Sequence, residues 1–167
     1  LARVAVVSDS RPLLDAVAQL LDTLDVATLP RGEIISQVIA RACYIIHAKT
    51  QTEISAAIEA FAPEHLSLMV RDPQVYLKSM RHVGAVFVGD MTPVASGIYL
   101  AGINHVLPTS GAARFSSGLA LSDFMRTFSV VENSRERMMN DVQSVAALAE
   151  FEGLPQHAQT ARMRSGA

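Results

Sequence analysis

The chain has 167 residues, half of them hydrophobic, with 14 basic and 16 acidic residues and a formal net charge of −2. This length allows one full domain and a small appendage, but not two complete domains. The mixed charges exclude a basic surface for nucleic acid or an anionic membrane, and no apolar run approaches the about 18 residues that would cross a bilayer.

The first part of the chain alternates strand and helix patterns. A β-branched run over residues 3–7 predicts a buried strand, and Ser8-Asp9-Ser10 after it are helix-capping residues. Apolar residues at helical spacing over 12–24 predict the helix that follows. A second helix pattern over 34–39 leads into a strand pattern over 43–48. Such βα units favour parallel strands.

The same alternation continues to residue 89. Thr50 and Glu53 form a capping box before a third helix, which Pro63 ends. We expect a third strand over 65–70 and a fourth over 84–89, with a helix between them. The predicted fold class is therefore α/β, an incomplete Rossmann-like, mostly parallel sheet with flanking helices, followed by a long loop and a helical C-terminal tail.

Residues 90–118 keep neither a helix nor a strand period, and five of the nine glycines lie between 89 and 118. Irregular segments longer than about 12 to 15 residues are usually functional or disordered. Specific apolar residues such as Tyr99 and Phe115 argue against disorder. We predict an α/β domain over 1–118 in which residues 90–118 form an ordered, site-forming loop.

The remaining residues, 119–167, are predicted to form a helical tail. Residues 124–131 suggest a short amphipathic piece, whereas 156–167 are polar and expected to be loosely held. A helical stripe ends at Gly153 and consists of Met138, Val142, Val145 and Ala149. One helix cannot bury such a stripe alone, so we expect it to pack on the α/β domain or on a partner subunit.

The strongest candidates for chemistry are Glu64 and His65, at the start of the third strand. A carboxylate and an imidazole placed there can act as a base and its orienting partner. The alternative is that Glu64 is solvated and His65 packs at the end of the sheet. His105, in the glycine-rich loop, has no core role suggested by periodicity. His82 is expected to close a helix, where the helix dipole favours a cation.

Other motifs for chemistry are weak. His157 follows the last stripe in a polar segment, where simple exposure is the plainer interpretation. The chain has no Gly-x-Ser-x-Gly elbow, no Gly-x-Gly-x-x-Gly turn and no Walker loop. The single cysteine, Cys43, and the lack of a signal-like segment predict a cytoplasmic protein.

Two longer motifs resemble histidinol dehydrogenase: Pro63-Glu64-His65-Leu66 and Asn104-His105-Val106-Leu107-Pro108-Thr109. The segment 113–119 and Glu152-Gly153-Leu154 with His157 follow in the family's order. The likeness covers essentially the whole chain and matches the C-terminal portion of a longer enzyme. It implies an intertwined homodimer that oxidises L-histidinol to L-histidine in two NAD-dependent steps, with zinc holding the substrate.

The resemblance also implies a role for each candidate residue. Glu64 would activate the water that attacks the aldehyde intermediate, and His65 would be the general base. His105 would contact the substrate. Glu152 and His157 would reach into the partner subunit's site, Glu152 towards the substrate amine and His157 as a zinc ligand.

This chain departs from the family pattern in its metal and cofactor residues. Ile98 stands where the family has a ligand aspartate, and isoleucine cannot coordinate a metal. The family's other two zinc ligands and its nicotinamide-binding domain lie upstream of the matching part. Of the zinc ligands only His157 remains, against the three or four that a zinc site needs. We therefore expect no cofactor in this chain and no catalysis by it alone.

Three functions remain open from the sequence. The first is a histidinol dehydrogenase-like protein that keeps the scaffold and part of a pocket for a small alcohol or amino alcohol. The second is one part of a split or related zinc- and NAD-dependent dehydrogenase for another small alcohol. The third is a non-enzymatic interaction module that dimerises through its tail. The mean hydropathy of +0.26 leaves room for a buried homodimer interface.

Overall fold

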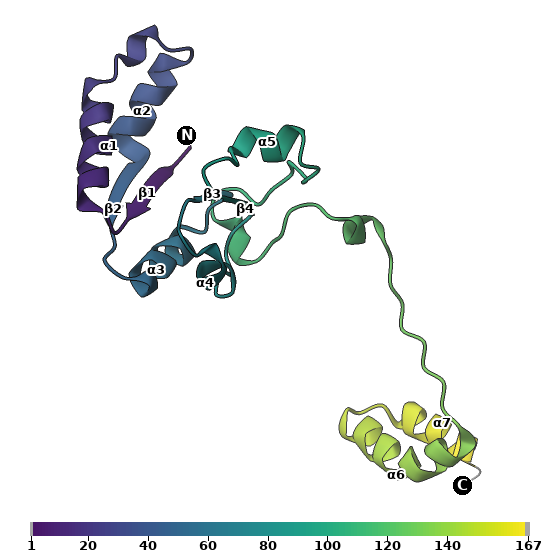
Figure 1. Cartoon of the computed structure of the whole chain (residues 1–167). Helices are drawn as coiled ribbons and strands as arrows, with labels where there is room; N and C mark the ends of the chain where they lie inside the picture. Colours follow the sequence, from purple (N-terminus) through teal and green to yellow (C-terminus); the bar gives the residue numbers. More distant parts are fainter. Residues whose placement is uncertain (1, 166–167) are drawn as a thin grey trace. The chain divides into compact units, whose positions relative to one another are not determined.

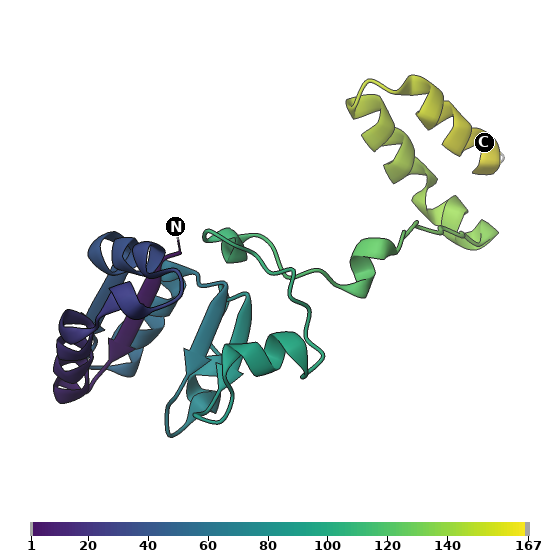
Figure 2. The ribbon, with the colours of Figure 1, turned by 90° about the horizontal axis from the view of Figure 1, so that it is seen from above.

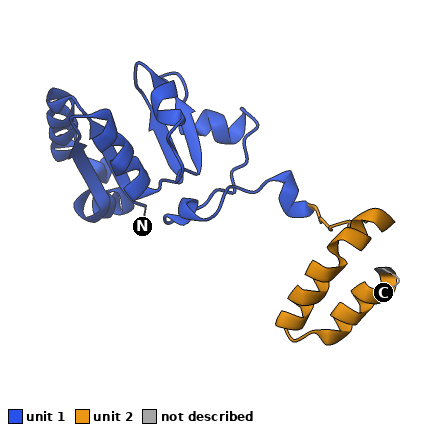
Figure 3. Ribbon diagram, turned by 90° about the horizontal axis from the view of Figure 1, so that it is seen from below, with its two compact units in different colours: residues 1–124 blue, residues 125–167 orange. Residues whose placement is uncertain are grey.

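The computed structural model describes residues 2–165. The chain divides into two compact units, residues 1–124 and residues 125–167, which Figure 3 shows in different colours. The first unit holds all the described strands, and the second is helical.

The strands of the first unit form two parallel pairs (Figure 1). Strand β1 (Val4–Ser8) pairs with β2 (Cys43–His47), and β3 (His65–Leu68) pairs with β4 (Ala85–Val88). The predicted α/β class and the parallel strands are confirmed. The four strands make two separate two-stranded sheets within the described residues, however, and not one continuous sheet.

Two of the first three helices, α1 and α3, begin at predicted capping residues. Helix α1 (Arg11–Thr23) starts at Ser10, whose side chain accepts a hydrogen bond from the backbone of the first turn. Helix α2 (Gly32–Ala42) runs directly into β2. Helix α3 (Gln51–Phe61) starts at Thr50, and the Glu53 carboxylate reaches back to the Lys49 amide at 2.6 Å. Local sequence therefore sets these helix starts.

The segment predicted as one irregular loop contains regular structure. After α4 (Pro73–Leu77) and β4, residues 94–99 form helix α5 (Val94–Tyr99), and a 3₁₀ turn η2 follows (Ala112–Arg114). The prediction of no helix in 90–118 is wrong for α5. Gly97 is buried in that helix, where an added Cβ would lie 2.2 Å from the Phe87 ring. Tertiary packing on β4 thus holds a helix that its sequence favours weakly.

The second unit is a helical hairpin of α6 (Arg135–Phe151) and α7 (Pro155–Ser165). The prediction of a loosely held end is wrong for α7, while residues 166–167 lie outside the described part. The amphipathic piece expected over 124–131 is also absent, because the 3₁₀ turn η3 (Leu121–Phe124) ends there and no element is described again before α6.

Only a small share of the apolar side chains is buried in either unit. The largest buried side chains of the first unit are Leu14, Ile58, Leu68 and Phe87, and those of the second unit are Val142, Ala146, Ala158 and Ala161. Many other large apolar side chains are exposed, among them Leu20, Met91, Phe115 and Phe128. Exposed apolar surface on this scale marks interaction surfaces. None of the helices in the described part of the chain is long and apolar enough to cross a membrane.

Candidate functional site

Glu64 and His65 lie together where α3 gives way to β3. Ala62 ends α3 in the left-handed conformation (φ 48°), and Pro63 prevents the helix from continuing. His65 Nδ1 lies 3.7 Å from Glu64 Oε1, and the two side chains are 29% and 34% exposed. This distance is an ion-pair contact and too long for a hydrogen bond. The pair predicted from the sequence is therefore brought together by the fold.

The pair lies on the wall of a cavity of the first unit whose volume is about 880 Å³. Phe61 of α3 also lines this cavity, and so do residues 109–111 of the later loop. Behind the imidazole, the Phe87 ring centroid lies 5.9 Å from that of His65. One side of the imidazole thus packs on the core while the site stays open to a small molecule, as proton transfer requires.

His105 lies in the loop after α5, apart from Glu64 and His65. Its side chain is exposed and does not line the cavity of Glu64 and His65. The neighbouring Asn104 fixes the loop, since its amide donates to the Leu119 carbonyl and its Oδ1 accepts from the Val106 amide at 2.8 Å. The structure therefore orders the loop on both sides of His105 without bringing that imidazole to Glu64.

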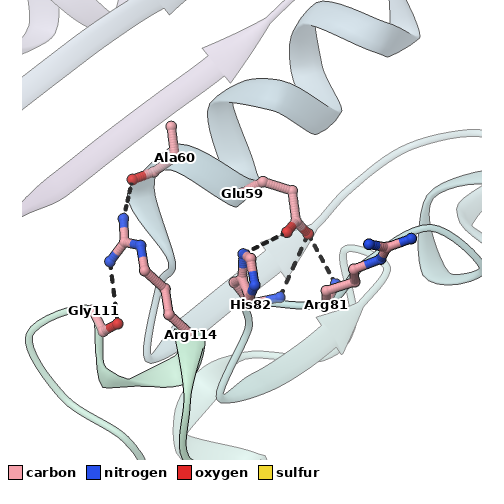
Figure 4. A network of polar contacts seen from close by, with 6 residues as sticks. All are labelled: Glu59, Ala60, Arg81, His82, Gly111 and Arg114. Atoms are coloured by element: carbon pink, nitrogen blue, oxygen red, sulfur yellow. Dashed lines mark hydrogen bonds and ion pairs between the residues drawn. The ribbon is translucent and has the colours of Figure 1, made fainter.

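Arg114 holds this loop against the end of α3, as Figure 4 shows. Its guanidinium donates to the Ala60 carbonyl at 2.5 Å and to the Gly111 carbonyl at 3.1 Å. The last carbonyls of a helix lack partners within the helix, and a cation there is favoured. Arg114 thereby places residues 109–111 on the cavity wall. No pattern in the sequence predicts this role, although Arg114 lies in the segment 113–119 that resembles the family.

A second pair of a carboxylate and an imidazole lies next to this contact in Figure 4. Glu59 Oε2 is 2.8 Å from His82 Nδ1, and Glu59 Oε1 accepts from the Arg81 amide at 2.9 Å. Helix α4 ends at Leu77, so the prediction that His82 closes a helix is wrong. His82 pairs with a side chain of α3, and neither member of the pair lines the cavity. Its role is to join α3 to the loop before β4.

Glu152 and His157 both belong to the second unit, at the turn between α6 and α7. Glu152 directly follows α6 as its C-cap residue, and Gly153 comes next in the left-handed conformation (φ 74°). The Leu154 amide donates to the Ala149 carbonyl at 2.8 Å, which completes a Schellman turn. His157 lies in the first turn of α7. The turn thus presents both exposed side chains at one end of the hairpin.

The described residues do not form a metal site by themselves. Within residues 2–165 no group of three or more His, Cys, Asp or Glu side chains could hold a metal ion. Ile98 is half-buried in α5 and offers no donor atom. Zinc sites take three or four protein ligands, so the donor set of this chain alone does not fit zinc.

The backbone beside Glu64 leaves no room for a side chain at Gly84. A Cβ at this position would lie 2.6 Å from the Glu64 carbonyl oxygen, inside the turn where the Gly84 amide bonds to Pro63. We expect Gly84→Ala to lower the free energy of unfolding of the first unit by about 1 to 2 kcal/mol, because a backbone atom must move. Gly118→Ala is the matched control, since its Cβ meets the flexible end of Leu107 at 3.0 Å and the Val106 carbonyl oxygen only at 3.2 Å. Urea melts of both variants check this, and equal midpoints would contradict it.

Comparisons with known proteins agree with the motifs on which these residues lie. The sequence profile of the family described as histidinol dehydrogenase matches residues 1–165. Histidinol dehydrogenase of Xanthomonas oryzae pv. oryzae is 40% identical over 165 residues, which are 99% of this chain and 38% of that protein. The enzyme of Bacillus subtilis is 38% identical over 158 residues, 95% of this chain and 37% of that protein.

A solved structure shows the same likeness in three dimensions. The crystal structure of histidinol dehydrogenase from Elizabethkingia anophelis matches with a TM-score of 0.86 at 26% identity, covering 97% of this chain and 37% of that one. The chain therefore spans less than two fifths of the length of these relatives. With a profile match over nearly every residue, the chain belongs to the histidinol dehydrogenase family.

Proposed function

We propose that this chain supplies the acid–base part of a histidinol dehydrogenase-type site and needs the remainder of such an enzyme to oxidise an amino alcohol. The observation that carries the proposal is the contact between Glu64 and His65 on the wall of the cavity. The relatives named above are histidinol dehydrogenases, so L-histidinol is the substrate to test first.

The two side chains divide the proton chemistry between them. In the proposed reaction His65 takes the proton of the substrate hydroxyl, and the Glu64 carboxylate orients the imidazole and stabilises its cationic form. Glu64 then accepts a proton from the water that attacks the aldehyde. The 3.7 Å separation suits this exchange of roles, because contacts of this kind shorten when the substrate is bound.

The cofactors of the family do not fit this chain alone. Besides the missing metal donors, the turn after β1 is Ser8-Asp9-Ser10, and Ser10 caps α1 with its side chain. A dinucleotide-binding turn needs glycines there, so that the backbone can approach the pyrophosphate. We therefore assign no hydride-transfer or zinc step to these residues and propose that the chain by itself is not catalytic.

Several finer assignments belong to the same proposal. The two strand pairs are parts of one incomplete Rossmann-like sheet, and the domains are an α/β domain over 1–118 and a helical tail over 119–167. The tail exchanges between the subunits of a homodimer and brings Glu152 and His157 to the partner's site. The segment between η3 and α6 exposes apolar side chains such as Phe128 and Val131. Contact with a second subunit would cover them, which supports the proposed homodimer. His105 reaches the substrate from the ordered loop.

A second candidate function is a related dehydrogenase, completed by another polypeptide and acting on another small alcohol. The observation that favours it is Ile98, an apolar side chain at the position where the resemblance implies a metal-binding aspartate. A changed ligand set would alter how the substrate is held. Replacing L-histidinol by other amino alcohols in the assay below separates the two candidates.

The proposal is tested by mixing this chain with a second polypeptide. That polypeptide is the part of the Bacillus subtilis enzyme that does not match this chain. The 167-residue chain alone, with L-histidinol, NAD and zinc, is expected to produce no NADH. The mixture with the complementary polypeptide is expected to produce NADH at a rate proportional to the concentration of this chain.

Either arm of the assay can contradict the proposal. NADH formation by this chain alone would show that the chain needs no other part. A mixture that forms a complex in gel filtration, but produces no NADH from L-histidinol or other amino alcohols even when this chain carries Ile98→Asp, would show that the chain contributes no acid–base function.

A further inference from the structure

The cavity lined by Glu64 and His65 also has a cation on its wall. Arg3 stands immediately before β1 and lines this cavity. Figure 2 shows the arrows of β1 and β3 pointing the same way, so the starts of both strands lie at one end of the first unit. Glu64 likewise stands immediately before β3. The fold therefore brings a guanidinium, a carboxylate and an imidazole to one cavity.

An aromatic ring of α3 holds the Arg3 guanidinium in place. The Arg3 Cζ atom lies 4.9 Å from the centroid of the Phe61 ring, which is a cation–π contact. The Phe61 ring in turn packs edge-on against Tyr44 of β2, with the ring centroids 6.4 Å apart. A cation–π contact supplies no acceptor atom, so the five N–H donors of the guanidinium still need partners.

The Arg3 side chain has no carboxylate partner among residues 2–165. Its one polar or ring contact there is with Phe61. Glu64 lines the same cavity but pairs with His65 and not with Arg3. The Arg3 side chain is exposed, so water meets its donors in the free protein and a ligand can replace that water. An arginine with unused donors on a cavity wall is suited to bind an anion.

The charges on the wall select among anions. The Glu64 carboxylate lines the same cavity and repels a multiply charged anion such as phosphate. An amino acid carries a carboxylate but no net charge, so this repulsion is much weaker for it. A carboxylate also matches the planar guanidinium, with which it can form two parallel hydrogen bonds. The cavity of about 880 Å³ is within the range of small-molecule sites, about 300 to 1,000 Å³.

We propose that the cavity is a binding site for an α-amino acid, whose carboxylate pairs with the Arg3 guanidinium. The inference rests on the proposed function, because two oxidations of an amino alcohol by NAD, with addition of water between them, convert its CH₂–OH group into a carboxylate. That carboxylate forms on the carbon whose hydroxyl His65 deprotonates, in the cavity that Arg3 lines. Arg3 therefore holds the charged product and distinguishes it from the alcohol.

Titration of the 167-residue chain with two ligands, followed by NMR amide shifts, tests the amino-acid site. L-Histidine carries the carboxylate, whereas histamine keeps the imidazole and the amine but lacks that group. Arg3→Gln is expected to weaken the binding of L-histidine by roughly tenfold to a hundredfold, the usual loss for a hydrogen bond to a charged group. The same variant is expected to leave the affinity for histamine unchanged.

Two further variants separate charge, geometry and fold. Arg3→Lys keeps the charge but loses the planar fork, so it is expected to recover only part of the affinity for L-histidine. Arg71→Gln is the matched control, because Arg71 is an exposed arginine that follows β3 and does not line the cavity. This control is expected to bind both ligands as the native chain does. Amide spectra without ligand check that each variant is folded.

The titrations can overturn the amino-acid site in three ways. The first is that the native chain does not bind L-histidine, or that Arg3→Gln binds it equally well. The second is equal weakening of both ligands by Arg3→Gln, which would reduce Arg3 to a packing role beside Phe61. The third is tighter binding of inorganic phosphate than of L-histidine, lost in Arg3→Gln, which would assign Arg3 to a phosphate group. NADH formation enters none of these titrations, so the proposed activity and the amino-acid site can fail separately.

Discussion

Replacing His65 by asparagine is expected to lower the rate of NADH formation by the complemented enzyme by roughly a hundredfold to ten-thousandfold, the contribution usual for a positioned general base. Asparagine keeps a polar side chain of similar reach but cannot take a proton. The Glu64 carboxylate then loses the imidazole that lies 3.7 Å away, while the backbone ladder to β4 is unchanged. Initial rates with L-histidinol and NAD, compared at equal complex concentration, measure the effect.

His82→Asn is the matched control for this experiment. His82 also pairs with a glutamate, Glu59, at 2.8 Å, but this pair does not line the cavity. The control is expected to keep the rate within about threefold, with a small loss of stability because the pair is partly exposed. Equal losses in the two variants would mean that His65, like His82, has only a structural role.

The features predicted correctly from the sequence are local ones. Ser10 and Thr50 were assigned as helix starts because their side chains can bind free amides of a first turn, and the structure has both caps. The strands that begin at Val4 and Cys43 follow from short runs with β-branched residues. Such signals depend on neighbours within four residues, so a single sequence is enough to read them.

The division of the strands into two separate sheets could not be predicted from such local signals. Strand pairing depends on contacts between distant segments, and the same runs fit one sheet or two. A continuous sheet was therefore the natural expectation.

Helices α5 and α7 were missed for two different reasons. Gly97 lowers the helix propensity of α5, and its burial against Phe87 supplies the compensating packing. Helix α7 has no wide apolar stripe, because its buried positions are the alanines Ala158 and Ala161. Alanine is a strong helix former but gives little hydrophobic periodicity.

The candidate site was predicted in part. Glu64 and His65 are adjacent in sequence and precede a strand, so their proximity followed from the sequence. The contact of Arg114 with Ala60 joins residues 54 positions apart, and no periodicity reports it. Periodicity likewise gave no means of telling that His105 would stay away from the cavity lined by Glu64.

The hairpin of the second unit is expected to be the part most sensitive to a single substitution. Ala158 of α7 is completely buried, and Ala146 of α6 is 1% exposed, so small side chains let the two helices approach closely. Ala158→Leu adds three carbon atoms where no space is left. Overpacking of this kind costs about 3 kcal/mol, which is comparable to the whole stability of so small a unit.

We therefore expect Ala158→Leu to separate α7 from α6 and to break the salt bridge between Arg162 and Glu150, 2.7 Å long in the native hairpin. Amide exchange over residues 135–165 measures the loss, with the amides of the first unit as an internal reference. Ala147→Leu is the matched control, because Ala147 is an exposed neighbour of Ala146 on the same helix. If both variants kept slow exchange in α7, close packing through Ala158 would not hold the hairpin, and the turn at Gly153 would have to do so alone.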